Sequence, residues 1–148
     1  MGANWSLIAA TLERESKTQT IRLEPLINMD AFDTDVSGPR LADSVIEAYL
    51  KLAPTFINKI EEGFARSEWL VVHRQAHSLK SSSANVGAQP LADLCKALEL
   101  MSLEQVDDSV RSAMKTLTQD IAREGKAVFE ALTLIAKLRS PDGDLTMP

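Results

Sequence analysis

Residues 76–87 read Ala-His-Ser-Leu-Lys-Ser-Ser-Ser-Ala-Asn-Val-Gly, and this stretch decides how the rest of the chain is interpreted. It places one histidine, His77, in the middle of a helical pattern and surrounds it with small side chains. A helix turns by about 100° per residue, so Val72, Leu79 and Val86 fall on the side opposite His77. The pattern therefore predicts a helix that buries its apolar face and exposes the histidine.

The exposed side of this helix has a composition of its own. Five residues share it with the histidine, namely His73, Arg74, Lys80, Ser81 and Ala84. Lys80 and Arg74 are cations that would offset the negative charge of a phosphoryl group. Ser81 and Ala84 are short, so that a second protein could come close. A neutral imidazole is nucleophilic at physiological pH. The helix is therefore suited to carry a phosphoryl group on His77.

The remainder of the chain also has the periodicity of helices, and we find no strand pattern. Its 148 residues suffice for one domain with a buried core, and the aromatic content is only 5%. We expect an all-α fold, with helices over residues 4–15, 40–64, 67–86, 90–101 and 107–138. A short helical piece is expected near residues 28–33, within an irregular connection from 16 to 39. The predicted organisation is an N-terminal helical arm or linker (1–27), a helical bundle (28–138) and a loose C-terminal tail (139–148).

Several local signals refine these boundaries. Pro54 predicts a kink or a break near residues 52–54, because proline lacks the N–H that a helix needs. Ser67 is the predicted N-cap of the histidine helix. Gly87 is predicted to end that helix in the left-handed conformation. Gly125 falls on the buried stripe of the last helix, where it would allow a close approach by a neighbour. On the helix over 40–64 the predicted buried stripe is Leu41, Val45, Tyr49, Leu52, Phe56, Ile60 and Phe64.

Composition excludes several classes of function. The net charge of −5 argues against a nucleic-acid-binding protein, which usually has a basic surface. No apolar run approaches the roughly 20 residues that span a bilayer, so no membrane insertion is expected. The chain has no secretory signal pattern and a single cysteine, Cys95, which fits a reducing cytoplasm. It also lacks a glycine-rich phosphate loop and an ATP-binding motif, so we expect no ATP-dependent kinase activity of its own.

The stretch from Ala76 to Ala88, with its histidine, lysine and glycine at set distances, resembles the signature of histidine-containing phosphotransfer (HPt) domains. The resemblance extends over residues 28–138 and includes the helix from Leu91 to Glu99. It implies an antiparallel four-helix bundle, here with an additional N-terminal helical segment. It also implies that His77 is phosphorylated and that Lys80 neutralises the phosphoryl oxygens.

The resemblance further implies the partners of the chain. His77 would accept a phosphoryl group from an aspartate of a response regulator receiver domain and pass it to another receiver. The receiver, which could belong to a hybrid sensor histidine kinase, would supply the acidic pocket and the Mg²⁺, so this chain needs no cofactor. Glu99, at the end of the family-like helix, would either lie near the histidine helix and contribute to docking or be a plain surface carboxylate. We expect a monomer, which is either a free protein or one domain of such a kinase.

One position departs from the family. The residue after the lysine is usually glycine, whereas this chain has Ser81, which could narrow the approach to His77. An alternative function is therefore an HPt-like interaction module that binds a receiver or kinase domain without phosphotransfer. A second alternative is a metal-binding bundle, because His73 and His77 lie one turn apart. That site would need carboxylates or Cys95 as further ligands, and we predict no metal.

Overall fold

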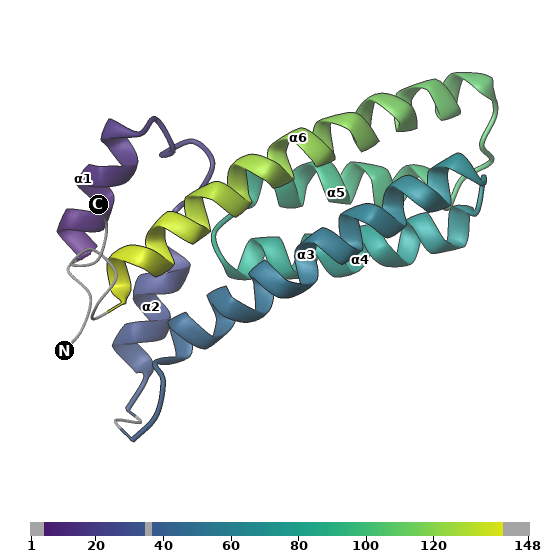
Figure 1. Ribbon diagram of the computed structural model, residues 1–148. Helices are drawn as coiled ribbons and strands as arrows, with labels where there is room; N and C mark the ends of the chain where they lie inside the picture. Colours follow the sequence, from purple (N-terminus) through teal and green to yellow (C-terminus); the bar gives the residue numbers. More distant parts are fainter. Residues whose placement is uncertain (1–4, 35–36, 141–148) are drawn as a thin grey trace.

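The computed structural model describes residues 5–34 and 37–140, and every regular element within them is an α-helix. The helices are α1 (Trp5–Arg14), α2 (Glu24–Phe32), α3 (Leu41–Ala65), α4 (Trp69–Asn85), α5 (Gln89–Met101) and α6 (Asp108–Arg139). Short connections join α3 to α4, α4 to α5 and α5 to α6, so successive helices run antiparallel (Figure 1). The predicted all-α fold is confirmed.

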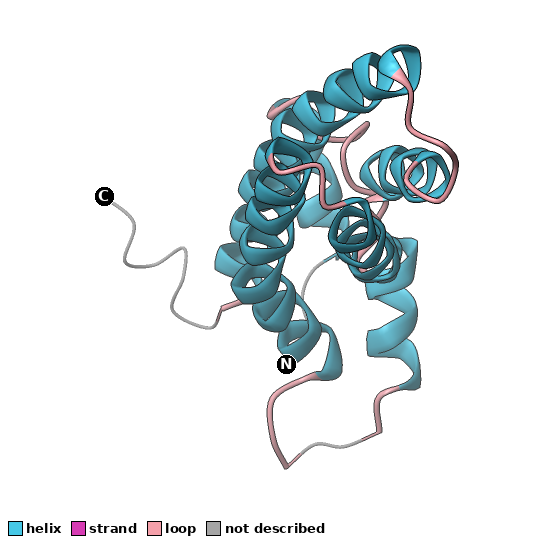
Figure 2. Ribbon diagram, turned by 90° about the vertical axis from the view of Figure 1, so that its right-hand side faces the viewer, coloured by secondary structure: helices cyan, strands magenta, loops and turns pink. Residues whose placement is uncertain are grey.

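Helices α3 to α6 form a four-helix bundle in which each helix packs against two others. α4 contacts α3 and α5, and α6 closes the ring by contacting the same two helices (Figures 1 and 2). The core consists of side chains without solvent exposure from all four helices, including Ile60, Val72, Leu79, Leu91, Leu98, Met114, Ile121 and Leu132. Burial of each large apolar side chain contributes about 1.5–3 kcal/mol, so this shared core holds the ring of helices together.

The N-terminal segment packs against the end of the bundle where α3 begins and α6 ends (Figure 1). Ile8, Leu12, Ile21 and Leu26 are buried and belong to the same apolar core as the bundle. α2 begins earlier than the helical piece expected near residues 28–33, because Pro25 occupies its first turn. A proline is tolerated there, where its missing N–H would have no helical partner.

Polar contacts fasten this segment as well. The Arg139 guanidinium, whose side chain is 2% exposed, donates to both carboxylate oxygens of Asp30 at 3.0 Å and also to Asp43. Trp5 Nε1 donates to Asp30 at 3.1 Å, and the Arg139 guanidinium lies 4.7 Å from the centre of the Trp5 ring. The last turn of α6 thus ties α1, α2 and α3 together.

The structure corrects the prediction of a break in α3. The helix continues through Pro54 from Leu41 to Ala65, so a break at that proline is wrong. Tyr49 and Ile60, on either side of Pro54, are both buried in the bundle core. This packing holds the two halves of α3 in one helix, although the proline cannot donate a backbone hydrogen bond.

Ser67 is not the N-cap of α4. It has a φ of 57° and occupies the left-handed position that ends α3. Glu68 N donates to Gly63 O at 2.8 Å and Ser67 N to Phe64 O at 3.1 Å, a Schellman closure. The Ser67 hydroxyl accepts a hydrogen bond from Arg111 at 2.7 Å instead of capping α4.

The predicted end of α4 is confirmed. Gly87 has a φ of +86°, and Ala88 N donates to Ser83 O at 2.8 Å in the same kind of closure. The predicted tail is described only at residues 139 and 140, and the rest of it lies outside the described residues. None of the described helices is both long and apolar enough to cross a bilayer.

Candidate functional site

His77 lies midway along α4 with its side chain 59% exposed. Val72, Leu79 and Val86 are completely buried on the opposite side of this helix. The exposed position predicted for the imidazole is therefore confirmed. The geometry follows from the sequence, because α4 can bury one apolar face against α3 and α5 only by turning His77 outward.

The carboxylate of Glu99, on the neighbouring helix α5, links His77 and Lys80. Nδ1 of His77 lies 2.7 Å from Oε2 of Glu99, and Nζ of Lys80 lies 2.7 Å from Oε1 of the same carboxylate. Glu99 is on α5 and its side chain is only 12% exposed, whereas Lys80 is 29% exposed. The structure thus brings together three residues that the sequence placed separately at the site.

The charge of Glu99 is set by two opposing effects. Burial tends to raise the pKa of this carboxyl group, since it disfavours the charged form. Hydrogen bonds from Lys80 and His77, together with their positive charges, outweigh burial and hold the pKa below its usual value. Glu99 is therefore ionised at neutral pH.

An ionised Glu99 determines which nitrogen of His77 carries the proton. A carboxylate can only accept hydrogen bonds, so Nδ1 of His77 must be the donor in the 2.7 Å contact. In the neutral ring this leaves Nε2 without a proton and with its lone pair available. The pair also holds the ring in one orientation. The exposed imidazole therefore presents an unprotonated Nε2, which is the form of the ring that can act as a nucleophile.

His73 contacts the backbone of the same glutamate. Its Nδ1 lies 3.1 Å from the carbonyl oxygen of Glu99, which also accepts a hydrogen bond of 2.9 Å from Ser102 Oγ. This carbonyl is in the last turn of α5, where helical N–H partners are missing. His73 therefore joins α4 to α5 and helps to fix the backbone from which Glu99 extends.

The other predicted site residues lie on the same side of α4. Arg74 and Ser81 are exposed, and Ala84 is half-buried. Neither Arg74 nor Ser81 forms a side-chain hydrogen bond with another described residue. Their predicted roles, like that of Ala84, stay predictions.

Sequence reasoning missed the role of Ser83. Its hydroxyl is fully buried and lies 2.9 Å from the Tyr49 hydroxyl of α3. Burial raises the pKa of Tyr49 to about 12, so the phenol is neutral. The signal was present in the helix geometry, which places Ser83 on the buried side and Ser81 on the exposed side. The three consecutive serines at 81–83 therefore contribute to both the exposed and the buried surface of α4.

The described residues contain no cluster of three or more histidine, cysteine, aspartate or glutamate side chains that could hold a metal ion. His73 and His77 both direct Nδ1 to Glu99, one to its carbonyl and the other to its carboxylate. Cys95 is buried on α5, and burial, with a smaller effect of nearby Glu99, raises its thiol pKa to about 12. The thiol is therefore neutral and part of the core.

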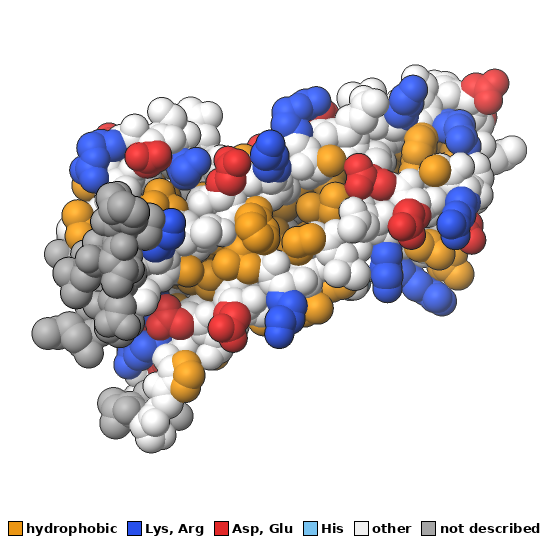
Figure 3. Space-filling view, viewed as in Figure 1, with side chains coloured by type: hydrophobic (Ala, Val, Ile, Leu, Met, Phe, Trp, Pro, Cys, Tyr) orange, Lys and Arg blue, Asp and Glu red, His pale blue; other side chains and the backbone are white. Residues whose placement is uncertain are grey.

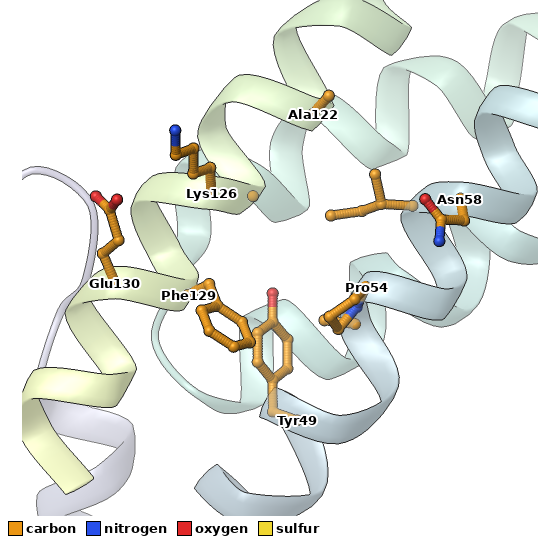
Figure 4. Close-up of a pocket in the computed structure, with 10 residues that line it drawn as sticks. Tyr49, Pro54, Asn58, Ala122, Lys126, Phe129 and Glu130 are labelled. Carbon is orange, nitrogen blue, oxygen red and sulfur yellow. The ribbon is translucent and has the colours of Figure 1, made fainter. Parts of the chain in front are cut away.

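A cavity of about 560 Å³ lies elsewhere, along the seam between α3 and α6. Figure 3 shows apolar side chains gathered along this seam, and Figure 4 shows Tyr49, Pro54 and Phe129 around the cavity. None of its lining residues belongs to the surface around His77. His77 therefore lies on the exposed side of α4, away from this cavity.

Comparison with known families agrees with this geometry. The family model of the Hpt domain matches residues 44–132, a range that contains all of α4 and α5 and most of α3 and α6. His77, Lys80 and Glu99 all lie within it. The same comparisons found no matching curated protein and no matching solved structure.

Proposed function

The chain belongs to the Hpt domain family, whose model matches more than half of it, and we propose that His77 carries a phosphoryl group between receiver domains of a phosphorelay. The observation that supports this proposal is the exposed imidazole whose Nδ1 is held by Glu99 at 2.7 Å. That contact leaves Nε2 as the nucleophile. The exposure of His77 fits a partner that brings its own acidic pocket.

The first transfer step begins with an aspartyl phosphate on the partner. The lone pair of His77 Nε2 attacks phosphorus, and the P–N bond forms as the P–O bond to the aspartate breaks. The electron pair of the broken bond leaves with the aspartate carboxylate. Nδ1 keeps its proton, so the phosphorylated ring is cationic, and the adjacent Glu99 carboxylate stabilises that charge.

The second step is the reverse reaction with another receiver. A carboxylate oxygen of that receiver attacks phosphorus, the P–N bond breaks, and its electron pair returns to Nε2. The imidazole then regains its neutral form with the proton still on Nδ1. Because Glu99 favours the same tautomer before and after, neither step requires a proton to leave the ring.

Lys80 would neutralise the phosphoryl oxygens. Its ammonium group has three N–H donors, and the contact of 2.7 Å with Glu99 uses only one of them. The remaining donors are available to a phosphoryl group on the neighbouring turn of α4. The same contact holds the flexible lysine side chain beside His77 when no phosphate is present.

The remaining components belong to the partner under this proposal. The receiver supplies the aspartate and the Mg²⁺, as the family resemblance implies, and the chain needs neither ATP nor a cofactor. We place the reaction in the cytoplasm, in line with the neutral, buried thiol of Cys95.

The proposal is tested by labelling the chain from phosphorylated receiver domains of the source organism. The expected product is a phosphate that is labile in acid and stable in base, and it should be absent from a His77→Gln variant. His73→Gln is the matched control, because it removes the other histidine one turn earlier on α4 and should retain the label. Label that persists in His77→Gln would refute the assignment.

One observation favours a second candidate function. Ser81 is exposed beside His77, at a position where the family usually has glycine. If its side chain blocks in-line approach, the chain would bind a receiver without exchanging phosphate. Tight binding of phosphorylated receivers without any labelling of His77, reversed by Ser81→Gly, would support this alternative.

A further inference from the structure

The N-terminal segment reaches the surface of α4 that displays His77. Ala84 follows His77 by two turns on the same side of the helix, which corresponds to about 10 Å along its axis. Ala84 lines a hollow of about 190 Å³ together with Arg22, Glu24, Pro25, Gly87 and Gln89. The connection between α1 and α2 therefore borders the histidine surface.

The backbone holds this connection in place. Arg22 N donates to Gly87 O at 2.9 Å. A Cβ atom on Gly87 would lie 1.9 Å from the Arg22 carbonyl oxygen, so the two chain segments approach more closely than any other residue at position 87 would allow. Ile21 and Leu26, on either side of residues 22–25, are buried. The position of Arg22 relative to α4 is thus fixed.

The side chains at the junction of the connection and α2 remain available to a partner. Arg22 and Glu24 form an ion pair of 3.6 Å, yet their side chains are 69% and 70% exposed. An ion pair this exposed contributes little to stability. Its two charges can therefore be matched or opposed by a docking protein at little conformational cost.

The usual size of a protein interface favours such a contact. A standard interface covers about 800 Å² on each partner, which corresponds to a disc with a radius of about 16 Å. A receiver centred on His77 therefore extends past Ala84 and over the hollow. We propose that Arg22–Pro25 is part of the receiver docking surface, and that Arg22 selects receivers with an acidic edge beside their phosphorylation pocket. This inference rests on the proposed function.

The test compares transfer rates to His77 from a panel of receiver domains phosphorylated with acetyl phosphate. For the fastest receiver, Arg22→Glu should lower the second-order rate constant about tenfold at low salt, because charges at an interface rim act mainly on association. The difference should shrink as salt screens the charges. Arg123→Glu is the matched control, since Arg123 is also an exposed arginine paired with a nearby carboxylate. It lies on α6, which is diagonal to α4, and should leave the rate within about twofold.

Two further variants separate docking from local stability. Arg22→Gln should show a smaller loss of rate than Arg22→Glu, with an unchanged melting temperature. The double variant Arg22→Glu, Glu24→Arg restores a local ion pair with reversed polarity. It should remain slow with the fastest receiver if Arg22 contacts the partner. Recovery of the wild-type rate in the double variant would overturn the inference.

The outcomes also distinguish this inference from the proposed function. Equal rates for Arg22→Glu, Arg123→Glu and wild type, with His77 still labelled, would overturn the docking role alone. The absence of transfer from every receiver of the source organism, or label retained by His77→Gln, would overturn the proposed function and this inference with it.

Discussion

His77 and Glu99 form a hydrogen-bonded pair across two helices, with 2.7 Å between Nδ1 and Oε2. The imidazole is exposed and the carboxylate is largely buried, so the pair joins the surface of the bundle to its interior. The buried partner restricts both the orientation and the tautomer of the exposed one. This relationship fixes which ring nitrogen of a surface histidine carries the proton, and it leaves the other nitrogen free to react as proposed.

Glu99→Gln should therefore slow transfer to His77 at least about tenfold, because the neutral amide no longer favours the Nδ1–H tautomer or the cationic phosphorylated ring. Nitrogen NMR of the imidazole should show a larger population of the Nε2–H tautomer in this variant. Glu47→Gln, which changes an exposed glutamate on α3, is the control. Unchanged rate and tautomer in Glu99→Gln would show that the pair has no role in reactivity.

The lowered pKa of Glu99 also predicts a pH dependence of stability. Because the folded-state pKa lies below the unfolded value of about 4.3, the stabilising contribution is present above that pH and is lost as pH falls through the folded-state pKa. Acid titration of the free energy of unfolding should show this loss in the wild type. The loss should be smaller in Glu99→Gln. Equal acid sensitivity of the two proteins would contradict a stabilising role of the Glu99 charge.

Ser81→Gly should accelerate transfer to His77, because it removes a side chain from the exposed side of α4 one turn from the histidine. Glycine is a poorer helix former than serine, so the free energy of unfolding should fall by about 0.5 kcal/mol. Ser81→Ala keeps the Cβ atom and removes only the hydroxyl. A rate that rises in Ser81→Ala as much as in Ser81→Gly would assign the effect to the hydroxyl instead of to bulk.

The Tyr49–Ser83 hydrogen bond should be visible in a double-mutant cycle. Tyr49→Phe or Ser83→Ala each leaves one buried hydroxyl without a partner, which costs about 1–3 kcal/mol. The double variant should cost less than the sum of the two single changes, and strict additivity would contradict the contact. Urea denaturation provides the measurement.

Arg139→Gln should release the N-terminal segment from the bundle. The change removes the buried cation that Asp30 and Asp43 share. Because Asp43 is 38% exposed and Asp30 keeps Arg40 at 3.5 Å, the cost should fall below the roughly 3–5 kcal/mol of a fully buried pair. Amide exchange should accelerate in α1 and α2 more than in α4 and α5. Arg123→Gln, on the exposed side of the same helix, should leave exchange unchanged, whereas equal protection in both variants would refute the proposed fastening.

The histidine surface was predictable from sequence because one helix determines it. The apolar residues of α4 fix the buried side, and the exposure of His77 follows from the helical repeat. The contact with Glu99 was not predictable in the same way, because it depends on how α5 is positioned against α4. A sequence pattern along one helix carries no direct information about that register.

The predicted buried stripe of α3 shows the same limit. Leu41 and Leu52 were expected inside and are about half exposed, while Ala42 and Ala53 are buried beside them. Large apolar residues normally mark the core. Here Ala42 and Ala53 belong to the buried core, and the two leucines lie beside them with about half of their surface exposed. Tyr49 and Ile60 of the predicted stripe are buried, so residue size identified the right face and failed only at its edge.

The atoms that a Cβ would meet predict different losses of stability when alanine replaces Gly125 and Gly87. A Cβ on Gly125 would lie 2.4 Å from Cδ1 of Ile57, the end of a flexible side chain that also lines the cavity between α3 and α6. Ile57 can move into that space, and alanine is favoured over glycine in a helix by about 1 kcal/mol. Gly125→Ala should therefore change the free energy of unfolding by no more than about 1 kcal/mol.

Gly87→Ala should lower the free energy of unfolding much more, because its Cβ would clash with the backbone carbonyl of Arg22, which cannot rotate away as a side chain can. The left-handed conformation costs a residue with a side chain about 1–2 kcal/mol. Displacement of Arg22 would also break the hydrogen bond to Gly87 O, worth about 1 kcal/mol. Urea denaturation should show a loss of at least about 2 kcal/mol in Gly87→Ala. A loss no larger than that of Gly125→Ala would mean that α4 can end, and Arg22 can dock, without this close backbone contact.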